Sequence, residues 1–242
     1  MPTGRCGTVG WVRSAREVLD RLTAAVVDGG AIEPLRDRIP MGEKGAAVLV
    51  LFDTGNGDRA EDLALTFVEK SPHLRRHAGQ FAFPGGRTEP EDADHVDTAL
   101  REAHEEIGLD RDQVSVLAVL PTVSVPSGYD VTAVVAHSAS TPQVHVGDVE
   151  EIAAIHRVPV SVLVDPQHRF TATYRPAADA VAGSGEDEHY AGPAFGIPAE
   201  GARAGVFIWG LTAHLLDTLL TLAGLAGPWD AQRTIPVPTQ YR

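Results

Sequence analysis

The most constraining feature of this 242-residue chain is a glycine pair followed, after a short polar segment, by an acidic helix. Residues 79–109 read GQFAFPGGRTEPEDADHVDTALREAHEEIGL. At about 100° per residue, Glu102, Glu105 and Glu106 fall on one narrow stripe of the helix, and an apolar stripe lies about 140° away. The apolar stripe consists of Val96, Leu100, Ala103 and Ile107. One helix face should therefore pack, and the other should present three carboxylates.

A divalent cation is expected among these carboxylates, because three like charges on adjacent helical turns repel one another. Oxygen ligands without Cys or clustered His favour Mg²⁺ or Mn²⁺ over zinc or copper. A solvated acidic face is the alternative for an arbitrary E-x-x-E-E triplet, but the glycine pair in front of the helix argues against it. Glycine lets the backbone approach closely, so the carbonyl of Gly86 could point at the same ion. We predict a metal site formed by Glu102, Glu105, Glu106 and Gly86.

The ends of the helix are also marked in the sequence. Asp94 with Asp97 suits an N-terminal cap, and Gly108 suits the residue that ends a helix. Arg101 directly precedes the triplet and could orient one of its carboxylates.

The segment REAHEEIGL resembles the signature box of Nudix hydrolases, in which a glycine and a glutamate precede R-E-U-x-E-E-x-G-U, where U is aliphatic. Residues Arg101 to Leu109 match, with Ala103 as a small instance of U. The spacing from Gly86 to Arg101 is one residue longer than in the general box, and Asp92 stands near the place of the first glutamate. The same lengthened form occurs in the coenzyme A diphosphatases, whose box is similar to GG-x-x-D-x-x-D followed by TALREA-x-EE-x-GL.

A second motif of that branch lies just upstream of its glycine pair, roughly L-L-T-x-R-S, then R, G and FPGG at fixed intervals. The positions that fall at those intervals here are Ser71, Arg75, Gly79 and Phe83-Pro84-Gly85-Gly86. Lys70 replaces the arginine of the pattern and Val68 the threonine. Lysine keeps the charge but loses the planar fork that binds two phosphate oxygens at once. The resemblance is densest over residues 66–109.

The resemblance implies hydrolysis of a diphosphate with Mg²⁺ or Mn²⁺. It assigns catalysis to Glu102 and Glu105, with Arg101 orienting a carboxylate. In relatives the general base is a box glutamate or a carboxylate from a later loop, for which Glu150 and Glu151 are candidates here. The residues expected to bind the substrate are Lys70, Ser71, Arg75, Gly79 and Phe83.

Three functions compete on this sequence. The first is hydrolysis of coenzyme A or acyl-CoA to a 4′-phosphopantetheine product and adenosine 3′,5′-bisphosphate, which the upstream motif favours. The second is hydrolysis of another nucleoside diphosphate derivative, such as a dinucleotide or a nucleotide sugar, which the departures at Val68 and Lys70 keep open. The third is a non-catalytic Nudix-like ligand sensor, against which the intact carboxylate triplet argues.

The amino-acid composition restricts the classes of partner that the protein can be expected to bind. With 33 acidic and 20 basic residues the net charge is −13, which disfavours nucleic acid and anionic membranes as partners. The single cysteine, Cys6, excludes a disulfide scaffold and suits a reducing cytosol. No export signal is evident at the start of the sequence, so we expect a cytoplasmic protein that binds a small molecule, as a monomer or a homodimer.

The order of elements predicts a single Nudix-like domain over residues 1–242, an α/β/α sandwich on a mixed sheet. A helix is expected from Ser14 to Val27, within a helical extension over 1–45, and another in the apolar stretch Val206 to Gly227. The expected strands are Ala46–Phe52, Leu63–Lys70, Val114–Val119, Val131–Ala136 and Arg169–Tyr174.

Three further segments have weaker patterns. Residues Glu150 to Ala154 suggest a helix or turn before a short segment that begins at Val158. Residues 176–205 are expected to form a flexible loop, or else a lid in which Tyr190 or Phe195 stacks on an adenine. Residues 234–242 are expected to form an extended tail.

Overall fold

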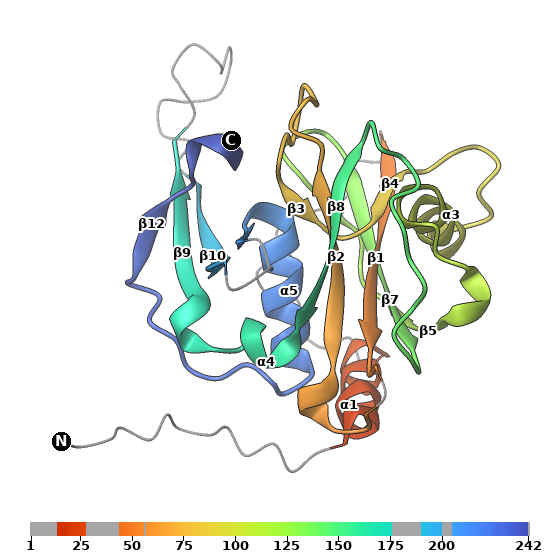
Figure 1. Ribbon diagram of the computed structural model, residues 1–242, viewed down its shortest axis with the longest axis horizontal. Coiled ribbons are helices and arrows are strands. Elements are labelled where there is room, and N and C mark those ends of the chain that lie inside the picture. Colours follow the sequence, from red (N-terminus) through yellow and green to blue (C-terminus); the bar gives the residue numbers. More distant parts are fainter. Residues whose placement is uncertain (1–13, 28–43, 56, 176–189, 200–204, 242) are drawn as a thin grey trace.

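The computed structural model describes residues 14–27, 44–55, 57–175, 190–199 and 205–241 (Figure 1). Its helices are α1 (Ala15–Val27), α3 (His95–Ile107), α4 (Val160–Leu163) and α5 (Gly210–Leu222). Its strands are β1 (Gly45–Asp53), β2 (Ala64–Lys70), β3 (Phe81–Ala82), β4 (Gly85–Arg87), β5 (Ser115–Val119), β6 (Val123–Ser124), β7 (Asp130–Ser138), β8 (Ile152–Pro159), β9 (Arg169–Tyr174), β10 (Tyr190–Ile197), β11 (Val206–Ile208) and β12 (Thr234–Pro236). Short 3-10 turns lie at Ala60–Asp62, Arg111–Gln113, Pro166–His168 and Thr239–Tyr241.

The main sheet is mixed, as predicted. Its central order is β3-β2-β1-β7-β5, with β4 paired to β1, β6 to β7 and β8 to β2. Strands β1 and β7 run parallel along their whole length, from the pair Gly45 and Asp130 to the pair Asp53 and Ser138. The other pairings of this sheet are antiparallel, including that of β1 with β2.

Helices cover both faces of the main sheet, which confirms the α/β/α sandwich. Successive side chains of a strand point to opposite faces. In β1, Leu49 and Leu51 accordingly pack with α3, whereas Val50 and Phe52 pack with α1 and α5. In Figure 1, α3 lies on the outer side of this sheet and α5 lies on the inner side.

Helix α1 begins where its capping residues predict. The Ser14 hydroxyl accepts a hydrogen bond from the backbone N–H of Glu17, and the Glu17 carboxylate accepts one from the N–H of Ser14. This reciprocal pair satisfies two N–H groups that the helix itself cannot. The rest of the predicted N-terminal extension, residues 1–13 and 28–43, lies outside the described part of the chain.

A second sheet was not predicted. Strand β9 has the predicted bounds, but it belongs to a separate sheet with the order β11-β10-β9-β12. Phe195 and Ile208 of this sheet share the large core cluster with Leu216 and Leu220 of α5. Helix α5 therefore lies between the two sheets, as Figure 1 shows.

Strand β10 corrects the prediction for residues 176–205. Tyr190–Ile197 forms a strand, and residues 176–189 and 200–204 lie outside the described part. Phe195 is fully buried, and the hydroxyl of Tyr190 accepts a hydrogen bond from the N–H of Gly210. The prediction that Phe195 stacks on an adenine is therefore wrong, because its ring has no exposed surface.

Two other segments also differ from expectation. Residues 152–159 form β8, a full partner of β2, where the sequence suggested a turn followed by a short segment. The C-terminal segment is no free tail, since β12 pairs with β9 and Val237 is buried. Tyr241 packs against Phe81 and Phe207, so the segment closes over the start of β3.

Helix α5 starts at Gly210, because the preceding residues Val206–Ile208 form β11. Its buried side includes Leu215, Leu219 and Thr218. None of the helices in the described part of the chain is long and apolar enough to span a membrane.

Candidate metal and diphosphate site

The glycine pair forms the short strand β4, which lies against β1 under the acidic helix. Gly85 and Gly86 pair with Val48 and Ala47. Gly85 has a φ of 153°, and a Cβ there would collide with the backbone of β1. A Cβ on Gly86 would lie 2.5 Å from the carboxylate of Glu102. Both positions therefore need glycine, for strand packing at Gly85 and for access of Glu102 at Gly86.

Helix α3 is fixed at both ends by the predicted residues. The Asp94 carboxylate accepts a hydrogen bond of 2.9 Å from the N–H of Asp97, and Gly108 ends the helix with a φ of 64°. The apolar stripe is buried against the sheet, with Ala103 and Ile107 fully enclosed. This packing sets the rotation of the helix and points Glu106 toward β4 and β2.

Glu106 is the most enclosed carboxylate of the triplet, with a side chain that is 3% exposed. Its Oε1 atom lies 2.5 Å from the Nζ atom of Lys70, and its Oε2 atom accepts a hydrogen bond of 3.0 Å from the N–H of Gly85. Burial raises the pKa of Glu106, and the charge and hydrogen bond of Lys70 oppose this shift only in part.

Arg101 holds a network of oxygen atoms around the same helix. Its guanidinium donates to both oxygens of Asp92 and to the carbonyl of Arg87, and it also reaches Glu102 at 3.1 Å and Glu105 at 3.2 Å. The hydrogen bond from Arg101 holds the pKa of Asp92 well below its usual range. Sequence reasoning placed Asp92 near the first glutamate of the box but did not identify it as the partner of Arg101.

Glu102 and Glu105 differ in their surroundings. Glu102 is largely buried, and burial raises its pKa with a further contribution from the charges of Glu106 and Glu105. The side chain of Glu105 is 55% exposed and its described polar contacts are with Arg101. The triplet therefore consists of one enclosed, one half-enclosed and one solvent-facing carboxylate, and not of three equivalent ones.

The three glutamates do not converge on one point. Within the described ranges, no three acidic, histidine or cysteine side chains come together closely enough to hold a metal ion. The reason is that each carboxylate is engaged by a basic side chain, Glu106 by Lys70 and the other two by Arg101. The donors nevertheless suit a hard divalent cation, since they are all oxygens, and the Glu102 carboxylate can lie against β4 only because residue 86 has no side chain.

The upstream segment lies at the same place, because Lys70 ends β2 next to Glu106. Ser71 is buried, and its N–H donates to the carbonyl of Glu151 at 2.7 Å. Arg75 is exposed in the loop that follows. Gly79 has a φ of 66° and faces the backbone of Gln240. Lys70 and Ser71 thus lie beside the candidate site, Arg75 is an exposed residue of the following loop, and Gly79 shapes that loop.

The structure corrects the expectation for Phe83. We expected it to contact the substrate, but its ring is buried and stacks on Phe67 with the centroids 4.9 Å apart. Its role is to anchor the strand pair that carries the glycine turn. Two residues before β4, a buried aromatic and a substrate-binding aromatic give the same sequence signal.

Glu150 and Glu151, the two candidate general bases outside the box, have different surroundings in the structure. Glu151 Oε2 lies 3.6 Å from Lys70 Nζ, and its charge contributes to the raised pKa of Glu106. Glu150 is exposed, and its N–H donates to the carboxylate of Asp148. Of this pair, Glu151 is the residue that the structure brings to Lys70 and Glu106.

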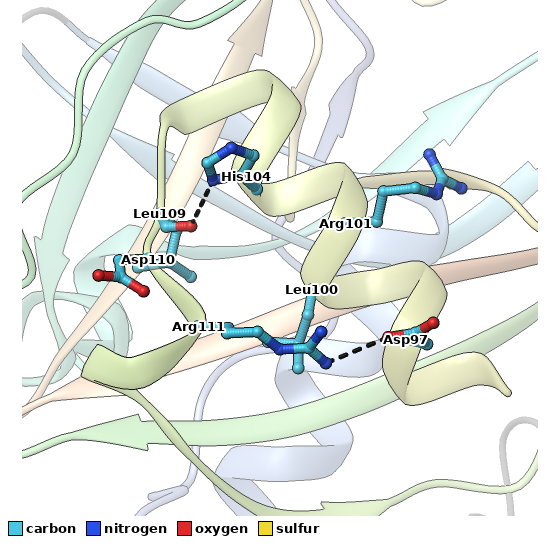
Figure 2. A pocket seen from close by; sticks show the side chains of 7 residues that line it. All are labelled: Asp97, Leu100, Arg101, His104, Leu109, Asp110 and Arg111. Carbon is cyan, nitrogen blue, oxygen red and sulfur yellow. Dashed lines mark hydrogen bonds and ion pairs between the residues drawn. The ribbon is translucent and has the colours of Figure 1, made fainter. Parts of the chain in front are cut away.

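A cavity of about 360 Å³ lies on another side of α3 (Figure 2). It is lined by Asp97, Leu100, Arg101, His104, Leu109, Asp110 and Arg111. Arg111 pairs with Asp97 at 3.1 Å, and a ring nitrogen of His104 lies 3.1 Å from the carbonyl of Leu109. The lining includes none of the three glutamates, so this cavity is not the site described above.

The chain matches known proteins over the region that carries this site. Residues 43–180 match the family model of the NUDIX domain. A protein of Escherichia fergusonii named "Uncharacterized Nudix hydrolase NudL" is 30% identical over 200 residues, covering 80% of this chain and 90% of that protein. A protein of the same name from Enterobacter sp. (strain 638) is 35% identical over 130 residues, covering 54% of this chain and 65% of that protein.

Among solved structures, a Nudix hydrolase from M. smegmatis, RenU, is 24% identical with a TM-score of 0.41, covering 48% of this chain and 71% of that one. The match with the Enterobacter relative leaves about a third of that relative's length uncovered.

Proposed function

This chain belongs to the Nudix family, and we propose that it hydrolyses the diphosphate linkage of coenzyme A or acyl-CoA with the help of Mg²⁺ or Mn²⁺. The products would be a 4′-phosphopantetheine compound and adenosine 3′,5′-bisphosphate. One observation carries the proposal: the segment with the coenzyme A-type motif and the Nudix box meet in one site, where Lys70 binds Glu106.

In this proposal Glu102 and Glu106 hold the metal, with Glu105 sharing it directly or through water and the carbonyl of Gly86 as a further ligand. A bound divalent ion would neutralise the diphosphate and lower the pKa of a water molecule. The protein contributes a partly dry site, in which fixed charges act more strongly than in bulk water.

Arg101 is a positioning residue in this scheme. It holds Glu102 and Glu105 on one side and Asp92 on the other, so it limits the rotamers of both helix carboxylates. The guanidinium remains charged at all relevant pH values, and its bond to Asp92 raises its pKa further. Preorganised ligands of this kind avoid an entropic cost when the metal and the substrate bind.

The general base is Glu105 or Glu151. Glu105 is exposed to solvent beside the predicted metal ligands. Glu151, which directly precedes β8, faces Lys70. Separate Glu105→Gln and Glu151→Gln variants distinguish them. The variant that lacks the base should have a lower kcat, and its activity should no longer rise with pH on the acid side of the profile. The other variant should keep that rise.

Arg75 and Ser71 are the proposed contacts with the nucleotide half of the substrate. Ser71 is held by its backbone bond to Glu151, so its position relative to the box is fixed. Arg75 projects from the exposed part of the same loop, where a guanidinium can bind two phosphate oxygens.

A second candidate is hydrolysis of another nucleoside diphosphate derivative, such as a dinucleotide or a nucleotide sugar. The departure at Lys70 favours it, because the branch pattern has an arginine there and a lysine lacks the planar fork that binds two phosphate oxygens at once. The acidic composition and single cysteine support a cytoplasmic enzyme with a small-molecule substrate under either candidate.

The deciding experiment is a substrate panel. Purified protein is incubated with coenzyme A, acetyl-CoA, ADP-ribose, NADH and diadenosine polyphosphates in Mg²⁺ or Mn²⁺, and the products are resolved by chromatography and mass spectrometry. We expect coenzyme A compounds to have the highest kcat/KM and to release adenosine 3′,5′-bisphosphate. A preference of about tenfold for another substrate, about 1.4 kcal/mol in transition-state binding, would favour the second candidate.

A further inference from the structure

Lys70 occupies an unusually restricted place for a lysine. It is the last residue of β2, its N–H donates to the carbonyl of Gln80, and its own carbonyl accepts from the N–H of Gly79. The backbone is therefore fixed on both sides. The side chain is only 16% exposed.

The charged groups that face this ammonium are Glu106 at 2.5 Å and Glu151 at 3.6 Å. The other oxygen of Glu106 already accepts the N–H of Gly85. Each oxygen of Glu106 thus has a hydrogen-bond partner within the chain. Oε1 keeps a second lone pair, but a divalent cation bound there beside the ammonium would be repelled by it, because a carboxylate that is only 3% exposed leaves the two charges poorly screened.

We infer that Lys70 is an exchangeable counter-ion of the metal site: it neutralises Glu106 in the metal-free protein and competes with the divalent ion for the same carboxylate. The inference rests on the proposed function only in taking Glu106 as a metal ligand. Lys70 would then set the metal affinity of the site. The positive charge also stays near the site after exchange, where it further weakens metal binding by repulsion.

The first test is metal affinity, measured by calorimetric titration of Mn²⁺ into the EDTA-treated, dialysed protein. Lys70→Met should bind Mn²⁺ at least tenfold more tightly than the wild type, whereas Lys70→Arg should not. Lys44, the only other lysine of the chain, gives a matched control. Lys44→Met makes the same charge change, and its Mn²⁺ affinity should stay within about twofold of the wild type. An unchanged or weaker affinity in Lys70→Met would overturn the inference.

A second test needs no variant and therefore holds even if Lys70→Met folds poorly. The wild-type protein is treated briefly with acetic anhydride, with and without Mn²⁺, and acetylation of the two lysines is measured by mass spectrometry. Lys70 should be labelled several-fold faster with Mn²⁺, because the ammonium is released from Glu106, and Lys44 serves as the internal reference. Equal labelling of Lys70 in both conditions contradicts the exchange.

Neither readout depends on the substrate. If coenzyme A is not hydrolysed but both results are obtained, the inference stands and the proposed substrate is wrong. If coenzyme A is hydrolysed and Mn²⁺ affinity is unaffected by Lys70→Met, only the inference fails.

Discussion

The guanidinium of Arg101 donates a hydrogen bond to each oxygen of Asp92, with Nε 2.8 Å from Oδ1 and Nη2 3.0 Å from Oδ2. The Asp92 side chain is 2% exposed, and it also accepts hydrogen bonds from the Thr98 hydroxyl and the N–H of Glu89. This pair joins the segment after the glycine turn to the middle of α3. The geometry of the box thus depends on a residue outside the glutamate triplet.

Asp92→Asn should lower the free energy of unfolding at pH 7 by about 1.5–3 kcal/mol, the range for a hydrogen bond to a charged group. The pKa of Asp92 is lowered in the folded protein, so its stabilisation is present above the usual value of 3.8 and is lost as the pH falls below it. The melting temperatures of the two proteins should therefore approach each other in acid. The same change at the exposed Asp58 should have little effect. A constant difference from pH 7 to pH 3 would contradict the ion pair.

Glu106→Gln should reduce kcat/KM by about 100-fold or more, because the loss of an anionic ligand of the proposed metal site would remove several kcal/mol of metal stabilisation. The same variant, free of metal, should melt at a higher temperature at pH 7. The pKa of Glu106 is raised in the folded protein. The stabilisation that Glu106 gives the folded state is therefore fully present below the ordinary pKa of 4.5 and is lost as the pH rises through the folded-state pKa. Glutamine has no such loss.

The control for this variant is Glu105→Gln, where the carboxylate is mostly exposed. Its metal-free melting temperature should stay close to that of the wild type. Full activity of the purified Glu106→Gln protein, or of the wild type in EDTA, would refute the metal site.

Gly86→Ala should weaken Mn²⁺ binding and activity while leaving the melting temperature almost unchanged. The new methyl group would lie 2.5 Å from the Glu102 carboxylate, which ends a flexible side chain and can move away. Gly205→Ala is the matched control, since a Cβ there has ordinary contacts of 3.4 Å or more. Calorimetric titration and thermal melting separate the two effects. A large loss of stability with intact metal binding would argue that residue 86 serves only the strand.

Arg75→Ala should raise KM for coenzyme A more than it lowers kcat, because it removes a contact made already in the ground state. The neighbouring Arg76→Ala makes the same change in the same exposed loop and should leave both constants nearly unaltered. Steady-state kinetics on the preferred substrate measure both. Identical behaviour of the two variants would remove Arg75 from the substrate site.

The box helix could be predicted residue by residue because its signals are local. Asp94 caps it, Gly108 ends it, and Ala103 and Ile107 face the sheet, all within about four turns of one another. The interactions of the glutamates could not be read in the same way. Lys70 is 36 residues from Glu106, and their meeting depends on where β2 ends relative to α3.

The second sheet was missed for a different reason. Strand β10 contains Gly192, Pro193 and Gly196, which are depleted in strands and indicate a loop. A single-sequence pattern cannot show that β9 and β11 supply the partners that make this composition tolerable. Residues Glu150 to Ala154 suggested a helix or turn locally, but from Ile152 onward the chain forms β8, and pairing with β2 overrides that preference.

The contact between the loop after β2 and the C-terminal segment links the candidate site to the order of synthesis. The amide of Gln80 donates to the carbonyl of Tyr241, across 161 residues of sequence. Contacts so distant in sequence form late and slow the folding of a chain. While the chain emerges from the ribosome, the loop that carries Arg75 has no such tether until residue 241 is added. Translation must therefore reach residue 241 before this loop acquires its contact with the C-terminal segment.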